Sequence, residues 1–370
     1  MHGIFPAKRL LCYRGFRRDF ALNYELIKII NKCITEKYYE RIFFKTNDRN
    51  QLLTYEDIKR KMIMLSQKNN ALLLGNGFSI SYEANFSFEN LINNMNKNDN
   101  IINNLFSKLE LTNSYDIEEI MKHLEISQRV LECFDFNDKL GIVEESKIKL
   151  KEEFIKIIRE KHPKFLDEKS STAIEFIEPY SNIFTLNYDL LLYWLMMEYN
   201  KKAEDDKRKK YCDGFFKKDL SLTFQEAYCD KNFFFLHGAL HLFEIDNKLI
   251  KIRNKDKAIL GQIIQQINNK NYPVCVLGGD SNKKLEQILK NKYLQFCLEQ
   301  LKTIECDNLV IFGTKLKEND EHIREAINSN HNIKNIFLGI SDCEKRLEIK
   351  PFSTDKNIFF YDYRSVKLWK

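Results

Sequence analysis

Residues 69–79 read NNALLLGNGFS, and this stretch decides the fold. The short apolar run Ala71–Leu74 ends in Gly75-Asn76-Gly77, which predicts a buried strand, a tight turn and then a helix or loop. Glycines at such a turn let the backbone approach a phosphate closely, and the first N–H groups of a following helix attract the anion. A G-x-G after a strand is also found in plain tight turns, so this stretch alone leaves both interpretations open.

Short apolar segments continue along the chain and alternate with segments of helical periodicity. Strands alternating with helices predict an α/β fold in which a Rossmann-like parallel sheet carries helices on both faces. Open parallel sheets bind ligands at the C-terminal ends of their strands, so polar residues at those ends are candidate site residues. The segments expected to contain these strands are 181–185, 232–245, 273–279, 308–312 and 332–341.

The chain divides by pattern into two parts. Residues 1–66 are expected to form a mostly helical N-terminal extension, and residues 67–370 a Rossmann domain. A helical insertion at about 86–180 interrupts this domain, because the segment is rich in Glu, Lys, Leu and Ile at helical spacing. Pro163 and the polar stretch 167–172 are expected to break the insertion.

Composition narrows the class of protein. The 370 residues are 44% hydrophobic and 13% aromatic, which is typical of an ordered chain with a large core. The net charge of +6 is a mild basic excess, and no recognition helix or aromatic–basic motif accompanies it, so direct binding of nucleic acid is not expected. Neither a signal peptide nor a membrane-spanning stretch is visible, which favours a soluble, cytoplasmic protein that binds no membrane.

The nine cysteines are scattered, and no two form a C-x-x-C pair. This spacing argues against a structural zinc site and against a disulfide framework, so no metal is expected. Scattered free thiols are typical of a reducing cytoplasm.

A second motif, FTLNYD, spans residues 184–189. Asn187 and Asp189 are two residues apart at the end of an expected strand, so on an extended backbone both side chains point to the same side. The alternative is an Asn–Asp turn in which Asp189 caps the following helix.

The third motif, FFFLHGALHLF at residues 233–243, places His237 before a glycine at the end of an aromatic strand. A neutral histidine can deprotonate a sugar hydroxyl, so His237 is a candidate general base. A histidine among apolar residues is also commonly structural, and His241 is a nearby rival for the same role.

The fourth motif, LVIFGTKLKENDEHI at residues 309–323, is another strand followed by a glycine and a hydroxyl. Thr314 and neighbouring backbone N–H groups are candidates to hold phosphate or ribose oxygens, and Lys315 can add positive charge. Alternatively Lys315 is solvated, and Asn319 or Asp320 caps a helix.

The order of these motifs resembles the signature of the sirtuin family, over roughly residues 69–341. Sirtuins carry a glycine-rich NAD loop, a T-x-N-x-D element, a His-Gly pair and a G-T-S loop in this order. In detail the chain is most similar to an uncharacterised bacterial sirtuin-related family with L-G-N-G-F-S, T-x-N-Y-D, L-H-G and G-x-x-L-x-x-N-D-x-H-I stretches. It also resembles the sirtuin-like NADases of bacterial phage defence, which implies an antiviral role.

The resemblance implies a function: binding of NAD as substrate and hydrolysis of its nicotinamide–ribose bond to nicotinamide and ADP-ribose. Asn187 would hold the ribose or the attacking water, Asp189 would seat the carboxamide, and His237 would be the general base. An NADase needs regulation, which implies a homo-oligomer or a regulatory partner protein. The residues expected to contact NAD are Gly75, Asn76, Gly77, Phe78, Ser79, Thr185, Gly313, Thr314 and Lys315.

Departures from the sirtuin pattern limit what is carried over. Asn76 stands in place of a small alanine, Lys315 in place of the serine of G-T-S, and the four-cysteine zinc module is missing. That module supports the acyl-peptide groove of sirtuins, so its absence argues against protein deacylation. The remaining alternative to an NAD hydrolase is a non-catalytic module that binds NAD or ADP-ribose, which is favoured if His237 points away from Asn187.

Overall fold

The computed structural model describes residues 52–65, 69–87, 90–91, 101, 104–105, 117–163, 166, 170–218, 221–227, 229–253, 259–278 and 280–370. The chain separates into two units, residues 1–51 and residues 52–370. Most of the expected N-terminal extension at 1–66 therefore lies outside the described residues. The fold below is that of the second unit.

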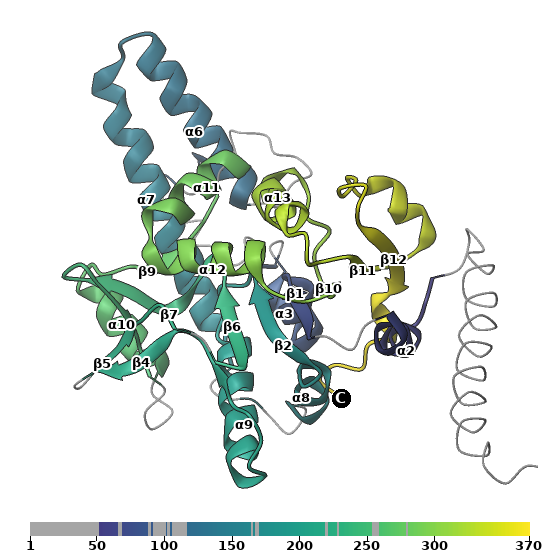
Figure 1. The fold of residues 1–370 in the computed structure, drawn as a ribbon. Helices are drawn as coiled ribbons and strands as arrows, with labels where there is room; N and C mark the ends of the chain where they lie inside the picture. Colours follow the sequence, from purple (N-terminus) through teal and green to yellow (C-terminus); the bar gives the residue numbers. More distant parts are fainter. Residues whose placement is uncertain are drawn as a thin grey trace, which may run out of the picture. The chain divides into compact units, whose positions relative to one another are not determined.

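A seven-stranded parallel sheet forms the centre of this unit, in the order β12-β11-β10-β1-β2-β6-β3 (Figure 1). If the short edge strand β3 is left aside, the strands follow the order 3-2-1-4-5-6 of doubly wound nucleotide-binding sheets. The predicted Rossmann-like α/β fold is thus confirmed. The strands are β1 (Asn70–Leu74), β2 (Tyr180–Thr185), β3 (Tyr211–Cys212), β6 (Lys231–Phe235), β10 (Asn308–Phe312), β11 (Asn335–Ile340) and β12 (Asn357–Asp362).

The central strands β1 and β10 are almost entirely apolar because both of their faces are covered. Ala71, Leu72, Leu73 and Leu74 each have 0% exposure, and every residue of β10 is buried. Unbroken apolar runs of this kind are typical of parallel strands with helices on both sides. The order of the sheet reverses between β1 and β10, so the loops that follow them leave in opposite directions and open a crevice at the edge.

Helices cover the two sides of the sheet. Helices α11, α12 and α13 pack on one another on one side, and α8 packs on α9 on the other (Figure 1). None of the described helices is long and apolar enough to cross a membrane. The helices are α2 (Tyr55–Leu65), α3 (Gly77–Tyr82), α6 (Ile117–Cys133), α7 (Asn137–Lys161), α8 (Ser170–Ile177), α9 (Leu191–Asp205), α10 (Ile259–Asn268), α11 (Ser281–Lys290), α12 (Lys292–Thr303) and α13 (Glu321–Ser329), with short 3-10 turns η1 (Ala84–Phe86), η2 (Glu318–Asp320), η3 (Cys343–Glu348) and η4 (Tyr363–Ser365).

The segment between β1 and β2 is helical in its described part. Helices α6 and α7 pack on each other as a hairpin that extends away from the sheet (Figure 1). Helix α7 ends at Lys161, two residues before Pro163, and α8 begins at Ser170. The expected break at Pro163 is therefore present, because proline cannot continue the hydrogen bonding of a helix.

A second sheet of five antiparallel strands, in the order β4-β5-β8-β7-β9, differs from the expectation. We expected residues 238–245 and 273–279 to add to the parallel sheet, whereas they form strands of this second sheet. Gly238 explains the change, since its φ of +80° turns the chain directly after β6, and a Cβ there would lie 1.8 Å from the Val274 carbonyl oxygen. The strands are β4 (Phe215–Lys218), β5 (Ser221–Phe224), β7 (Gly238–Ile245), β8 (Lys248–Lys251) and β9 (Pro273–Cys275).

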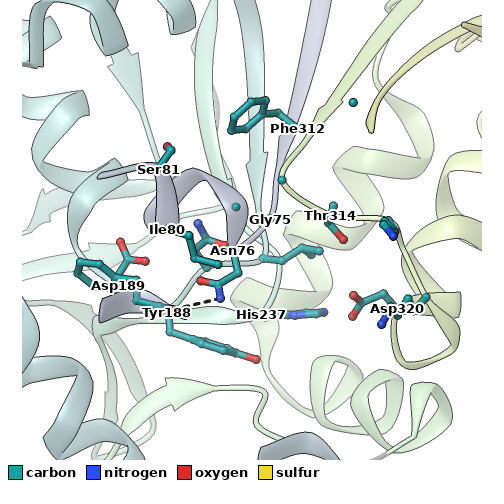
Figure 2. Close-up of a pocket in the computed structure, with 18 of the residues that line it drawn as sticks. Gly75, Asn76, Ile80, Ser81, Tyr188, Asp189, His237, Phe312, Thr314 and Asp320 are labelled. Atoms are coloured by element: carbon teal, nitrogen blue, oxygen red, sulfur yellow. Dashed lines mark hydrogen bonds between the residues drawn. The ribbon is translucent and has the colours of Figure 1, made fainter. Parts of the chain in front are cut away.

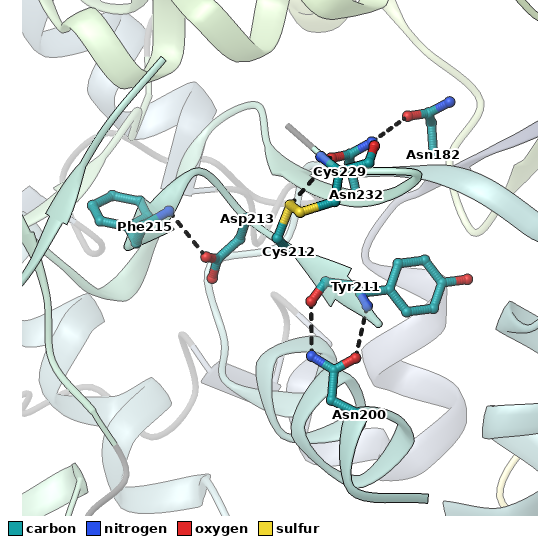
Figure 3. The surroundings of a disulfide bond; sticks show 8 residues. All are labelled: Asn182, Asn200, Tyr211, Cys212, Asp213, Phe215, Cys229 and Asn232. Carbon is teal, nitrogen blue, oxygen red and sulfur yellow. Dashed lines mark hydrogen bonds between the residues drawn. A yellow bond between two sulfur atoms is a disulfide. The ribbon is translucent and has the colours of Figure 1, made fainter. Parts of the chain in front are cut away.

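The expectation that all cysteines are free thiols is wrong at one place, because Cys212 and Cys229 form a disulfide (Figure 3). Strand β3 pairs with β6 so that Cys212 lies opposite Asn232. The Asn232 side chain accepts a hydrogen bond from the Cys229 N–H at 2.7 Å. Asn232 thereby holds the loop before β6 beside β3, a juxtaposition that sequence spacing does not reveal.

The turn at Gly238 yields a stability prediction. Gly238→Ala is expected to lower the free energy of unfolding by about 1–3 kcal/mol or more, because alanine is strained at positive φ and meets the Val274 carbonyl. The matched control is Gly141→Ala in α7, where a Cβ meets nothing within 4 Å. That change should stabilise the protein by about 0.5–1 kcal/mol. Urea unfolding of both variants checks this, and equal midpoints for the two would contradict the role of Gly238.

Candidate functional site

A cavity of about 610 Å³ opens at the C-terminal ends of β1, β2, β6, β10 and β11, where the strand order reverses (Figure 2). Its position is the one expected for the ligand site of a doubly wound sheet. The lining residues are Gly75, Asn76, Gly77, Ile80, Ser81, Phe86, Leu91, Phe154, Ile158, Leu186, Asn187, Tyr188, Asp189, His237, Phe312, Gly313, Thr314, Lys315, Lys317, Asn319, Asp320, Gly339, Ile340, Ser341 and Tyr363.

The floor of the cavity is made by two glycine turns that lie on each other. The Gly77 N–H donates to the Gly313 carbonyl at 2.9 Å, and the Gly75 N–H donates to the Phe312 carbonyl at 2.9 Å. A Cβ on Gly77 would lie 2.6 Å from the Gly313 Cα, and one on Gly75 would lie 2.4 Å from the Thr314 Cβ. The glycines are therefore required for the contact between the turns, and the Gly77 N–H is not available to a ligand.

Behind one wall, a buried chain of polar groups fixes Asn187 and Asp189. The Ser79 hydroxyl donates to Asp189 Oδ2 at 2.5 Å and accepts from Asn187 Nδ2 at 2.9 Å. Thr185 Oγ1 accepts from the Asn187 backbone N–H at 3.0 Å. The bond to Ser79 uses one of the two Nδ2 hydrogens of Asn187, so its amide oxygen and its second N–H are left to meet a ligand in the cavity.

Asp189 also holds the start of α9, since its Oδ1 accepts from the Leu191 N–H at 2.9 Å. The N-cap residue of α9 is Leu190, so Asp189 stands one position before the cap, from where it binds the first helical N–H and also lines the cavity. His162 lies behind it, where Nε2 accepts from the Leu190 N–H at 2.9 Å and Nδ1 lies 2.9 Å from the Pro163 carbonyl oxygen. These contacts set His162 as the neutral Nδ1–H tautomer, and burial lowers its pKa.

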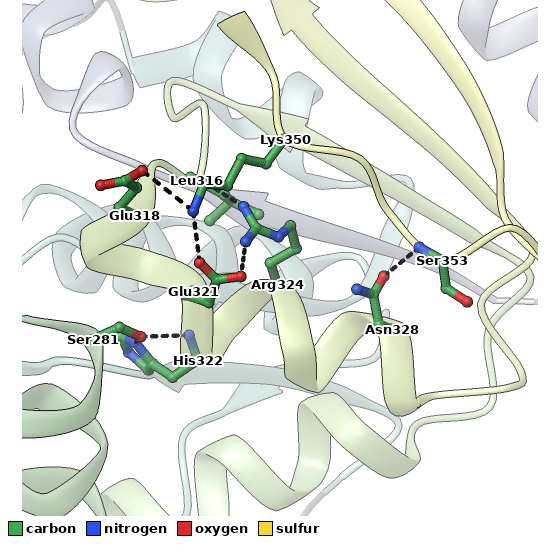
Figure 4. A network of polar contacts seen from close by, with 9 residues as sticks. All are labelled: Ser281, Leu316, Glu318, Glu321, His322, Arg324, Asn328, Lys350 and Ser353. Carbon is green, nitrogen blue, oxygen red and sulfur yellow. Dashed lines mark hydrogen bonds and ion pairs between the residues drawn. The ribbon is translucent and has the colours of Figure 1, made fainter.

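On the opposite wall, His237 meets a second histidine. Its Nε2 lies 3.0 Å from Nε2 of His322, whose Nδ1 lies 2.9 Å from the Ser281 hydroxyl. The Ser281 oxygen also accepts from the His322 backbone N–H at 2.7 Å (Figure 4). Burial, then Lys284 and His322, hold the pKa of His237 well below its ordinary value. Burial lowers the pKa of His322 to about 4, Asp320 opposes this and Lys284 adds to it.

His241, the rival histidine, lies in the core of the fold and does not line the cavity. It has 0% exposure, its ring stacks on Tyr193 with centroids 4.3 Å apart, and neither ring nitrogen has a hydrogen-bond partner among the described residues. Burial holds its pKa well below the ordinary value. Of the two histidines in the third motif, only His237 can contact a ligand in this cavity.

The loop from Gly313 to Asp320 is held in a strained shape. Leu316 has a φ of +46°, and Arg324 Nη1 donates to its carbonyl oxygen at 3.3 Å (Figure 4). The Thr314 hydroxyl oxygen accepts from the Leu316 N–H at 3.1 Å. A branched residue at positive φ costs free energy and persists only where its surroundings hold it, as Arg324 does here. The loop carries Lys317 into the cavity wall.

The two lysines of this loop differ in their partners. Lys315 forms an ion pair with Glu348, Nζ to Oε2 at 2.6 Å. Lys317 is exposed, lines the cavity and makes no ion pair with any residue in the described ranges. Lys317 is therefore the cation that can bind an anionic ligand without breaking an existing pair, and sequence reasoning chose Lys315 instead.

Apolar side chains form the remaining wall. Phe154 and Ile158 come from α7, and Phe86 from η1, so the segment inserted between β1 and β2 contributes to the cavity. Tyr188 completes this side, and its hydroxyl donates to the Val276 carbonyl at 2.6 Å. A wall of this kind excludes water and strengthens electrostatic interactions inside the cavity.

Most of the predicted site residues meet here. Those that line the cavity are Gly75, Asn76, Gly77, Asn187, Asp189, His237, Gly313, Thr314 and Lys315. Ser79 and Thr185 lie behind the wall and hold Asn187, and Phe78 packs on Trp369 in the core. Sequence reasoning missed Ser281 and Lys284, which no motif marks, and His322, which stands in the quoted N-D-x-H-I stretch. Across the described ranges, no three His, Cys, Asp or Glu side chains gather where they could hold a metal ion.

Comparison with known proteins gives a family and a distant structural likeness. Residues 72–360 match the family described as Domain of unknown function (DUF4917). No curated protein matches the chain. Among solved structures, one described as "Structural Basis for the Mechanism and Regulation of Sir2 Enzymes" is 12% identical, with 84% of this chain and 94% of that chain covered and a TM-score of 0.35. A likeness at this level is too weak to transfer an activity.

The low pKa of His322 predicts how stability depends on pH. Below about pH 6.5 the unfolded chain protonates this histidine, while the folded protein does so only near its pKa of about 4. The free energy of unfolding therefore falls by up to about 3 kcal/mol as the pH drops from about 6.5 to about 4. His322→Gln, which cannot titrate, should lose less stability than wild type between the two ends of the window in urea unfolding.

The control is His331→Gln, because the His331 side chain is 91% exposed. This variant should follow the wild-type pH dependence. Parallel curves for His322→Gln and wild type would contradict the burial of a neutral imidazole at this position.

Proposed function

The chain belongs to the DUF4917 family, and we propose that it binds NAD in the cavity and hydrolyses the bond between nicotinamide and ribose. The observation that carries the proposal is the convergence of Asn187, Asp189 and His237 on one cavity at the strand crossover. Doubly wound sheets bind dinucleotides at this crossover. The volume of about 610 Å³ lies within the range of small-molecule and cofactor sites.

The distribution of residues suggests how NAD lies. The adenosine half would occupy the end near Gly339–Ser341, at the C-terminal end of β11, and near Tyr363, which follows β12. Lys317 would neutralise the pyrophosphate from the loop after β10. This leaves the nicotinamide ribose between Asn187 and His237, at the apolar end of the cavity.

In the proposed reaction, water attacks C1′ of the ribose and the bond between C1′ and the nicotinamide nitrogen breaks. The nitrogen keeps the electron pair and leaves as neutral nicotinamide, and the ribose passes through a cation-like transition state. The Asn187 side chain would hold the water or a ribose hydroxyl through its amide oxygen or its second N–H, since Ser79 uses one Nδ2 hydrogen. His237 would take the proton that the water releases, as general base.

Asp189 would seat the nicotinamide carboxamide. A carboxylate offers about four acceptor positions, and the Ser79 hydroxyl and the Leu191 N–H use two of them. A remaining lone pair can accept from the carboxamide N–H. The contacts with Ser79 and Leu191 hold the carboxylate in place before the ligand arrives, which lowers the cost of ordering it.

His237 and Asn187 line the same cavity, and this arrangement supports hydrolysis over the alternative of a non-catalytic NAD or ADP-ribose binding module. Burial lowers the pKa of His237 as it does that of the core residue His241, so catalysis is supported by the position of His237 in the cavity wall. The binding module would be favoured if the purified protein bound NAD without cleaving it.

The first test is nicotinamide release from NAD by the purified full chain. Asn187→Ala and His237→Ala should each lower kcat by about 10²–10⁴-fold, because each removes a group at the reacting centre. NAD affinity by calorimetry should change far less in His237→Ala. The control is His331→Ala, an exposed histidine that should keep wild-type turnover.

Two results would count against the proposal. Binding of NAD without release of nicotinamide by wild type would favour the binding module. Full turnover in both site variants would show that the catalytic groups lie elsewhere.

The lysine pair gives a second test. Lys317→Ala should weaken NAD binding about tenfold and leave kcat nearly unchanged, because a free cation at the pyrophosphate is lost. Lys315→Ala should have a smaller effect, since Glu348 already neutralises this side chain. Lys334→Ala, with a 65% exposed side chain outside the cavity, is the control for loss of positive charge. Equal effects of Lys315→Ala and Lys317→Ala on affinity would contradict the assignment of Lys317.

A further inference from the structure

The contact between His237 and His322 restricts the proton positions on both rings. Their Nε2 atoms are 3.0 Å apart, so only one hydrogen fits between them, and one ring donates while the other accepts. Nε2 of His237 is thus committed to His322. Nδ1 has no partner among the described residues, and His237 lines the cavity whereas His322 does not. Nδ1 is therefore the nitrogen of His237 that meets a ligand.

Which ring donates depends on the Ser281 hydroxyl: if it donates to His322 Nδ1, His322 donates to His237, and if it accepts from Nδ1–H, His237 donates. The Ser281 oxygen accepts from the His322 backbone N–H at 2.7 Å and lies 2.9 Å from His322 Nδ1. A hydroxyl oxygen has two acceptor lone pairs, so it can accept from the backbone N–H and from Nδ1–H of the same residue. Ser281 is half-buried, which leaves its own hydrogen a path to solvent. With the proton of His322 on Nδ1, its Nε2 is bare and accepts from His237.

We propose that Ser281 and His322 are positioning residues that hold His237 in the tautomer whose unprotonated Nδ1 faces the cavity. The inference rests on the proposed function, because it names the atom of His237 that takes the proton from water. When Nδ1 takes that proton, the ring becomes an imidazolium whose Nε2–H already points at the bare Nε2 of His322. The bare Nε2 of His322 then stabilises the imidazolium by accepting its hydrogen bond, the part that a carboxylate plays in a Ser-His-Asp triad.

The surroundings keep the pair rigid. Ser281 is the first residue of α11 and His322 stands in the first turn of α13. One turn into α11, Lys284 binds Asp320 with Nζ to Oδ1 at 3.1 Å, and the Lys284 side chain is 1% exposed. This buried ion pair ties α11 to the residue before α13, so it sets the distance between Ser281 and His322.

Burial is the main reason why the pKa values of both rings are low. Lys284 lowers both further, and Asp320 opposes the shift at His322 only. The ring of Tyr188 stacks on the other face of His237, with centroids 6.4 Å apart. These surroundings keep both imidazoles neutral, so each ring has one bare nitrogen.

The decisive measurement is nitrogen NMR of the full chain labelled with ¹⁵N-histidine. The expected pattern for His237 is a bare Nδ1 and a protonated Nε2, and for His322 the reverse, with the two Nε2 atoms sharing one hydrogen. The signals are assigned with His237→Gln and His322→Gln. A protonated Nδ1 on His237 would overturn the proposal, because the ring would then donate to the ligand.

Kinetics of matched variants test the role of the pair. Ser281→Ala should lower kcat about 10–100-fold, as loss of an orienting partner does, with little change in NAD affinity. Ser281→Thr keeps the hydroxyl and should recover turnover. His322→Gln keeps an acceptor for His237 and should retain more activity than His322→Leu. Wild-type kcat and unchanged His237 signals in Ser281→Ala would overturn the proposal.

The hydrolase activity and the tautomer of His237 can be tested independently. If wild type binds NAD without cleaving it and the NMR pattern is as expected, the hydrolase function is wrong and the tautomer assignment stands. If wild type cleaves NAD and Nδ1 of His237 carries a proton, the function stands and the tautomer assignment is wrong. The NMR pattern on wild type decides even where a variant does not fold.

Discussion

The direct contact of two glycine turns is the constraint on which the rest of the site depends. Gly77 and Gly313 approach so closely that a side chain on either would meet the backbone of the other. Because the turns follow the central strands β1 and β10, the contact fixes how the two halves of the sheet present their loops. Every other part of the cavity wall is placed relative to this floor.

Two chains of polar groups from different parts of the sequence stand beside this floor. Ser79 joins Asn187 to Asp189 on one side, and His322 joins Ser281 to His237 on the other. A polar group without a hydrogen-bond partner costs much more free energy in the protein interior than in water. Each hydrogen-bonded chain therefore holds its side chains in one geometry. A ligand in the cavity therefore meets groups whose orientation is set before it binds.

The sequence predicts the fold well because its strongest patterns are local. The apolar runs that became β1, β2, β6, β10 and β11 all precede polar turns, and helices separate most of them. A central strand that is buried on both faces consists almost entirely of apolar residues, so these strands were recognisable in the sequence. The antiparallel sheet was not, because the chain leaves the parallel sheet through one positive φ at Gly238.

Some residues of the site were likewise recognisable in the sequence and others were not. Asn187, Asp189 and His237 follow recognisable strands, whereas Ser281 and Lys284 contact His322 and Asp320 only because α11 packs on α13. Pairing of side chains is equally invisible in the sequence. The sequence does not distinguish Lys315 from Lys317. In the structure Glu348 forms an ion pair with Lys315, which leaves Lys317 available to a ligand.

The order of the strands also governs when the cavity can exist. Gly75 and Gly313 are 238 positions apart, since 313 − 75 = 238, and the strand that carries Gly75 pairs with the strand that carries Gly313. Contacts between such distant segments form late in folding, because the chain between them must first be ordered. During synthesis from the N-terminus, the site therefore stays incomplete until most of the chain has been made. A chain cut short before β10 would contain Asn187 and His237 but not the second glycine turn of the cavity floor.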